Sequence, residues 1–173
     1  MNKIAKDEEY NSIVSSILTT KEFSETMSHI KHHNSTRLNH LLKVSYYSYK
    51  ISKYLRLDYE EVARAGLLHD FYLDSVSDQK NIKDKVLLYT MKHPQAAVEN
   101  SKKFFTLTEK EEDIIRTHMF PVDVKVPKYA ESWIVSLVDK SISTAEFGHK
   151  FGRQALEHAN LYIIFLLNFM RIG

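Results

Sequence analysis

The sequence lacks cysteine and is poor in glycine and proline, with four and three residues respectively among 173. The absence of cysteine excludes disulfide bonds and thiolate metal sites, and it fits a reducing cytoplasm, which is the compartment that we expect. Because glycine and proline interrupt regular structure, their scarcity favours long helices or strands with few breaks.

A strong net charge and long apolar runs are missing as well. The formal net charge is +2, which is too small to indicate a partner such as nucleic acid. The most apolar run, residues 161–170, has ten residues, whereas a membrane-spanning helix needs about 20. The charged residues 1–10 do not resemble a signal peptide. We expect no membrane partner, and we interpret residues 161–170 as a closing core helix, with an interfacial anchor or a contact in a homo-oligomer as alternatives.

Helical signals recur along the chain. Residues 36–55 carry apolar and small side chains at helical spacing. Asp58 with Glu61, and Thr108 with Glu111, have the spacing of an N-cap and its partner three residues later. These patterns predict helices over about 36–55, 59–69 and 108–119.

Pro94 suits the first position of a helix. We therefore expect His93 to be extended just before a helix that ends near Phe105. Two more helices are predicted over 129–145 and 152–170, with one or two shorter ones in the first 30 residues and a loop over 125–129. Since no strand alternation is found, the predicted fold is all-α, with residues 1–173 forming a single domain of seven or eight helices.

Imidazole and carboxylate side chains occur at the ends and on the apolar faces of these predicted helices. His69 and Asp70 close one helix after Leu67 and Leu68. Asp139 follows the apolar residues Ile134, Val135, Leu137 and Val138, and a carboxylate in such a run is costly to bury unless it pairs with a cation or a metal. The remaining candidates are His40, near the apolar face of residues 36–55, His93, and His118, four residues after Ile114.

Each candidate has a structural alternative when it is taken singly. His40 and His118 are each interpreted as hydrogen-bonded core residues, and Asp139 has Arg37 or Arg64 as an alternative partner. His32 and His33 are interpreted as a solvated pair. The recurrence of six such residues on separate helix ends and inner faces favours a common site.

The order of these residues resembles the HD-domain superfamily of metal-dependent phosphohydrolases. The matching stretches are TRLNHLLKVS around His40, ARAGLLHD around His69 and Asp70, MKHPQAA around His93, IIRTHM around His118 and SLVDKS around Asp139. The resemblance spans about residues 30–145 and implies a helical HD-like bundle. It also implies metal binding by His40, His69, Asp70, His93, His118 and Asp139.

His93 and His118 resemble the extra ligands of the two-metal branch, which includes diadenosine-tetraphosphate hydrolases and cyclic-dinucleotide phosphodiesterases. This chain departs from several substrate-specific patterns. It has no Gly-Tyr-Pro, which is the signature of the cyclic-di-GMP branch. The 5′-deoxynucleotidases have a Glu shortly after His-Asp, where this chain has Phe71, Tyr72 and Leu73. Alarmone hydrolases have Glu-Asp four and five positions after the His, where this chain has Leu73 and Asp74. The resemblance therefore indicates the class of reaction and leaves the substrate open.

The residue types suit divalent cations. Imidazole and carboxylate favour Fe²⁺ or Mn²⁺, with Zn²⁺, Ni²⁺ and Mg²⁺ as alternatives. Four neutral histidines and two aspartates carry a charge of −2, so two divalent ions would leave a net positive charge for an anionic substrate. Such a pair of ions can activate water and neutralise phosphoryl oxygens. We predict that Asp70 bridges both ions, and that Arg37 and Lys140 are catalytic cations, with surface salt bridges as their alternative role.

Three functions follow as hypotheses. The first is a phosphohydrolase that cleaves a phosphoester or phosphoanhydride of a nucleotide-like small molecule. The second is a non-heme di-iron oxygenase, because the HD-like fold also hosts inositol oxygenation. The third is a nucleotide-binding regulatory module that keeps the ligands for stability. Asp74 is interpreted as a helix-end carboxylate, with a proton shuttle as its alternative.

Overall fold

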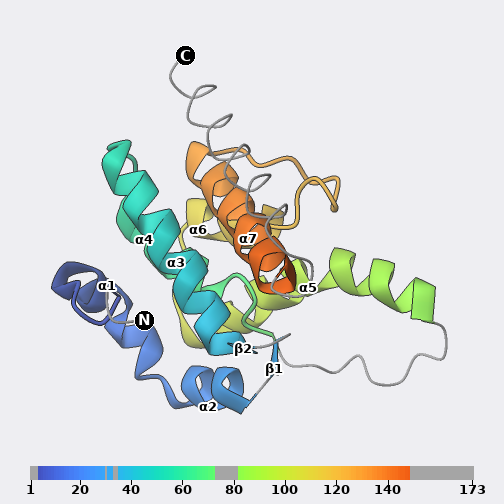
Figure 1. The fold of residues 1–173 in the computed structure, drawn as a ribbon, viewed down its shortest axis with the longest axis horizontal. Helices are drawn as coiled ribbons and strands as arrows, with labels where there is room; N and C mark the ends of the chain where they lie inside the picture. Colours follow the sequence, from blue (N-terminus) through green and yellow to red (C-terminus); the bar gives the residue numbers. More distant parts are fainter. Residues whose placement is uncertain (1–3, 30, 33–34, 73–81, 149–173) are drawn as a thin grey trace.

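The computed structural model describes residues 4–29, 31–32, 35–72 and 82–148 (Figure 1). Its helices are α1 (Glu8–Leu18), α2 (Lys21–His29), α3 (Arg37–Tyr54), α4 (Tyr59–Leu68), α5 (Ile82–Phe104), α6 (Glu109–Thr117) and α7 (Ala130–Gly148). Two strands of two residues each, β1 (Lys31–His32) and β2 (Ser35–Thr36), pair antiparallel. The predicted all-α fold is confirmed, while the short strand pair was not predicted.

Four helices form the centre of the bundle. α3 packs against α4 and α7, and α6 contacts both α4 and α7 (Figure 1). α1 packs on α4, α2 packs on α3, and α5 lies against α6. The fully buried apolar residues at these contacts include Leu41, Val44, Tyr49, Val62, Leu67, Leu68, Ile114, Ile115 and Val135. Their burial removes apolar surface from water and supplies the main driving force for this arrangement.

The close approach of α3 and α4 depends on Gly66. A Cβ atom at this position would lie 2.9 Å from the Cα of Ser45, which is closer than real Cβ contacts. Ser45 Oγ donates a hydrogen bond of 2.6 Å to the carbonyl of Ala63, and it accepts one of 2.8 Å from the Tyr10 hydroxyl. The contact therefore joins α1, α3 and α4 just before the end of α4.

The two helix starts predicted from capping residues, at Asp58 and Thr108, are confirmed. The Asp58 side chain accepts a hydrogen bond from the backbone N–H of Glu61. Thr108 and Glu111 form a complete capping box, with distances of 3.1 Å from Glu111 N to Thr108 Oγ1 and 3.0 Å from Thr108 N to Glu111 Oε2. These contacts satisfy backbone donors that a helix leaves free in its first turn.

The predicted start of the helix at Pro94 is wrong. α5 begins at Ile82 and continues through Pro94, so His93 is helical rather than extended. Proline lacks the N–H that would bond the carbonyl four residues earlier, which costs roughly 3 kcal/mol in a helix interior. Ala97 and Val98, just after Pro94, are buried, so the part of α5 that follows the proline packs against the bundle.

Several further features of the chain bear on the sequence analysis. The loop predicted over 125–129 is confirmed, because α7 begins at Ala130. The helix predicted over 152–170 lies outside the described residues.

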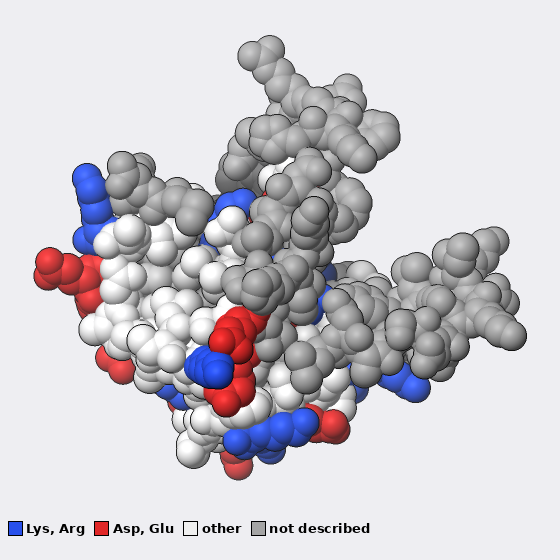
Figure 2. All heavy atoms as spheres, turned by 90° about the horizontal axis from the view of Figure 1, so that it is seen from below, with Lys and Arg blue, Asp and Glu red and all other residues white. Residues whose placement is uncertain are grey.

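In the part of the chain that the structure describes, every helix is too short or too polar to cross a membrane. Figure 2 shows one face on which described residues of both charges are interspersed with uncharged ones.

Candidate metal centre

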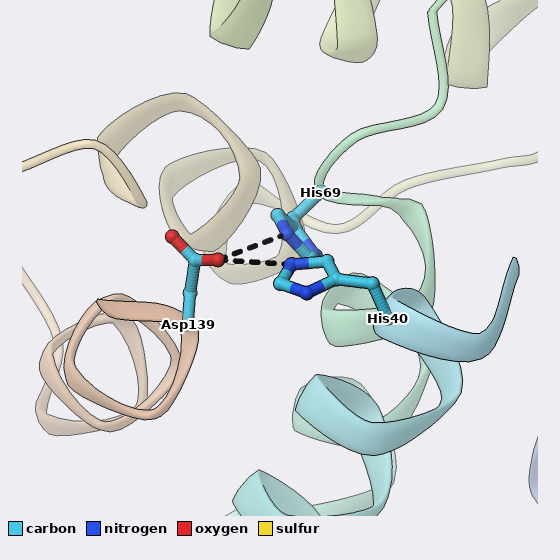
Figure 3. Close-up of side chains that lie close together, drawn as sticks. All are labelled: His40, His69 and Asp139. Carbon is cyan, nitrogen blue, oxygen red and sulfur yellow. Dashed lines mark hydrogen bonds and ion pairs between the residues drawn. The ribbon is translucent and has the colours of Figure 1, made fainter. Parts of the chain in front are cut away.

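Three of the predicted ligands meet where α3, the end of α4 and α7 converge. His40, His69 and Asp139 point toward one another from these three elements (Figure 3). Asp139 Oδ1 lies 3.1 Å from His40 Nε2 and 3.7 Å from His69 Nε2. All three residues are buried, and we call them the first cluster.

The second cluster consists of His69, Asp70 and His118, with His93 beside it. Asp70 Oδ1 lies 3.5 Å from His118 Nε2 and 3.4 Å from His93 Nε2, whereas its Oδ2 lies 4.0 Å from His69 Nε2. His93 Nε2 and His118 Nε2 are 3.0 Å apart. The two oxygens of Asp70 thus face different imidazoles, and all six predicted ligands form one continuous buried group.

Backbone carbonyls orient His69 and His118. Each residue is the C-cap of its helix, α4 or α6, where the last carbonyls have no partner within the helix. His69 Nδ1 donates to the carbonyl of Gly66 over 2.7 Å, and His118 Nδ1 donates to the carbonyl of Ile115 over 2.7 Å. With the Nδ1 proton held in this way, the Nε2 atom of each ring faces the cluster.

Two carboxylate side chains contact the ring of His40. Its Nδ1 lies 3.1 Å from Glu146 Oε2, and its Nε2 faces Asp139. Burial disfavours the charged ring, but the hydrogen bonds to these two carboxylates outweigh it and raise the pKa of His40 to about 10. Burial likewise opposes ionisation of Glu146, yet His40 and Lys43 lower its pKa to about 2.

The sequence analysis missed Glu146. A signal exists in its spacing, because it lies seven residues after Asp139 and therefore two helical turns along the same face of α7.

The second cluster has the opposite protonation tendency. Burial lowers the pKa of His118 to about 4, although Asp70 favours the charged ring. Burial would raise the pKa of Asp70, but His69, His118 and His93 hold it well below its usual range. Around neutral pH the second cluster therefore combines a carboxylate with a neutral His118 ring.

These residues fit a site for divalent cations. His69 Nε2 and Asp70 Oδ1 are buried, and neither makes a hydrogen bond of good geometry within the described part of the chain. Buried polar atoms without such a bond are costly, and a cation would satisfy both of them. The donor set of nitrogen and oxygen without sulfur suits Fe²⁺, Mn²⁺ or Zn²⁺.

Asp139 forms an ion pair with Lys140. Arg64, one of the two arginines considered as its partner, instead pairs with Glu111 over 2.6 Å. The ionic contacts of Asp139 are with His40, His69 and Lys140. Lys140 Nζ lies 3.0 Å from Asp139 Oδ2, and it also donates to the backbone carbonyl of His118. Lys140 therefore connects the first cluster to the end of α6.

Arg37 is buried, with 2% of its surface exposed. Its guanidinium donates to the backbone carbonyl of Tyr72 over 3.1 Å and to the Tyr72 hydroxyl over 3.0 Å. The same group lies 4.3 Å from the centre of the Tyr72 ring, and that ring is 5.3 Å from the His93 ring. Arg37 thus borders the second cluster through Tyr72.

Asp74 and His33 lie outside the described residues.

Comparison with known families agrees with this geometry. Residues 37–144, well over half of the chain, match the family model described as HD domain. The match contains all six predicted ligands and confirms the resemblance found in the sequence. This family generally comprises metal-dependent hydrolases of the phosphohydrolase superfamily. Neither a curated protein nor a solved structure matches the chain.

Proposed function

The chain belongs to the HD-domain family, and on that premise we propose that it is a metal-dependent phosphohydrolase acting on a nucleotide-like phosphoester or phosphoanhydride. One observation carries the proposal. Six imidazole and carboxylate side chains from five parts of the bundle face one another in a single buried group. Such a group is expensive in a core unless cations compensate it.

The two clusters suggest two divalent ions. His40, His69 and Asp139 would hold one ion, while His93 and His118 would hold a second, with Asp70 between them. When bound, such ions would supply Lewis acidity and lower the pKa of a water molecule. The carbonyls of Gly66 and Ile115 prepare two of the rings for this task by holding their Nδ1 protons.

Two cations of the chain support the same proposal. Lys140 contacts Asp139 and keeps its carboxylate ionised and oriented. Arg37 lies next to Tyr72 at the border of the second cluster, which supports our assignment of Arg37 to a substrate phosphate. The nucleotide part of the proposal rests on the resemblance to dinucleotide hydrolases of the two-metal branch.

The test begins with protein purified without chelator and analysed for bound metals. Metal-free protein is then reloaded with Fe²⁺, Mn²⁺ or Zn²⁺ and assayed for phosphate-ester cleavage on bis-p-nitrophenyl phosphate, nucleoside monophosphates and dinucleoside polyphosphates. We expect about two ions per chain and cleavage that requires reloading. Protein that neither retains a metal nor cleaves any of these esters after reloading would contradict the proposal.

The same preparation separates the alternative functions. An oxygenase would consume oxygen on inositol-like polyols and release no phosphate. A regulatory module would bind metal and nucleotide without turnover of either kind.

A further inference from the structure

One helix contacts both ring nitrogens of His40. Asp139 Oδ1 lies 3.1 Å from Nε2, and Glu146 Oε2 lies 3.1 Å from Nδ1. In Figure 3 one ring nitrogen of His40 faces Asp139, while the other points away from it. Because Asp139 and Glu146 share a face of α7 two turns apart, the packing of α7 on α3 sets both contacts at once.

A lysine holds Glu146 in place. Lys43 follows His40 by three residues on α3, and its Nζ lies 2.6 Å from Glu146 Oε1. The two oxygens of Glu146 are therefore divided between the imidazole and the ammonium group. The Glu146 side chain is 10% exposed and that of Lys43 is 37% exposed, so Glu146 lies between the buried ring and the more exposed ammonium group.

The position of His40 in its helix explains why a side chain is needed here. His69 and His118 are helix C-caps and use carbonyls left free by the last turn. His40 lies in the first turn of α3, where the preceding carbonyls bond to backbone N–H groups further along the helix. The first turn of α3 therefore offers the His40 ring no free backbone carbonyl of this kind.

We infer that Glu146 is a positioning residue for metal binding by His40, with Lys43 holding Glu146 in its orientation. Glu146 accepts the Nδ1 proton, and the ring then presents Nε2 to the ion beside Asp139 and His69. Partners of this kind in other metal sites raise ligand basicity and fix the ring, and their loss typically weakens metal binding about 10- to 100-fold. This inference rests on the proposed metal centre and adds a residue that does not itself touch the ion.

The test is titration of the metal-free, full-length protein with Co²⁺, followed by visible absorption and by competition with a chelator. Glu146→Gln keeps the shape of the side chain and removes its charge. We expect this variant to bind Co²⁺ about 10- to 100-fold more weakly and with an altered d–d spectrum. The matched control is Glu112→Gln on α6, because Glu112 pairs with Lys102 and Arg116 and contacts none of the predicted ligands. The control should keep the affinity and the spectrum.

Lys43→Met distinguishes positioning from simple electrostatics. Removing a positive charge near a cation site would strengthen Co²⁺ binding if only charge mattered. If Lys43 orients Glu146, binding should instead weaken by several-fold, with a spectral change in the same direction as that of Glu146→Gln. Lys43 is partly exposed, so this variant decides the question even if Glu146→Gln does not fold.

The results separate this inference from the proposed function. If the unaltered protein binds Co²⁺ and either Glu146→Gln or Lys43→Met leaves the affinity and the spectrum unchanged, the positioning role is wrong while the metal centre stands. A tighter site in Lys43→Met likewise overturns the positioning role. If the unaltered protein takes up no Co²⁺, the proposed metal centre itself fails, and the inference fails with it.

Discussion

The first and second clusters share His69 but are organised in different ways. In the first cluster, side chains of α7 hold His40 across about a hundred residues of sequence, and the pKa of His40 is raised to about 10. In the second cluster, the carbonyl of Ile115 holds His118 from three residues away, and burial lowers the pKa of that ring to about 4. One half of the centre thus holds a proton between carboxylates, while the other keeps a neutral imidazole. A cation bound by His40 would therefore displace a proton, whereas the ring of His118 is neutral around pH 7.

Asp70 joins the two clusters, so its replacement should have the largest effect. Asp70→Asn keeps the size of the side chain but removes the charge between the two clusters. We expect most of the bound metal to be lost, and kcat/KM to fall by more than about 1000-fold. Elemental analysis and an ester-cleavage assay measure both effects. Full activity in this variant would overturn the assignment of the whole centre.

The double variant His93→Ala, His118→Ala tests whether the second cluster holds its own ion. The first cluster remains intact, so the metal content should fall from about two ions to about one. Hydrolysis should fall by about 100-fold or more, because neutralisation of phosphoryl oxygens by the second ion is lost. Circular dichroism should show that the helical content persists. Retention of two ions by a folded double variant would show that these histidines are not ligands.

Arg37 tests whether the border of the second cluster binds substrate. If its guanidinium contacts a phosphate, Arg37→Ala should lower kcat/KM by about tenfold while the metal content stays the same. Tyr72→Phe is the matched control, because it removes one hydrogen bond of Arg37 and keeps the ring. A lower melting temperature with unchanged kinetics would show that Arg37 serves only the packing of Tyr72 and His93.

The smallest expected effect is the pH dependence of the metal-free protein. His118 has a folded pKa of about 4 against about 6.5 in the unfolded chain, so the unfolded state binds more protons between these values. Stability should therefore be lost as pH falls from 6.5 toward 4, by at most about 1.4 kcal/mol per pH unit from this residue. Denaturant unfolding of chelated protein at several pH values measures the slope, and His118→Asn should reduce it. An equal slope in both proteins would contradict the assignment of this effect to His118.

Local signals in the sequence predicted the parts of the fold that local contacts determine. The caps at Asp58 and Thr108 act over three residues, and the structure confirms both. Pro94 shows the limit of such signals, because it favours a first helical position, whereas α5 begins at Ile82 and continues through Pro94. His93 nevertheless lies beside the second cluster, although the geometry predicted for it was wrong.

By itself, the sequence determined the helical class, the family and the identities of the six candidate ligands, because residue type and spacing along a helix are local properties. Tertiary structure alone decided which side chains meet. Glu146 illustrates this, since only the packing of α7 against α3 brings its carboxylate to His40. The same holds for the two pKa values, because they depend on burial and on neighbours that lie far apart in the chain.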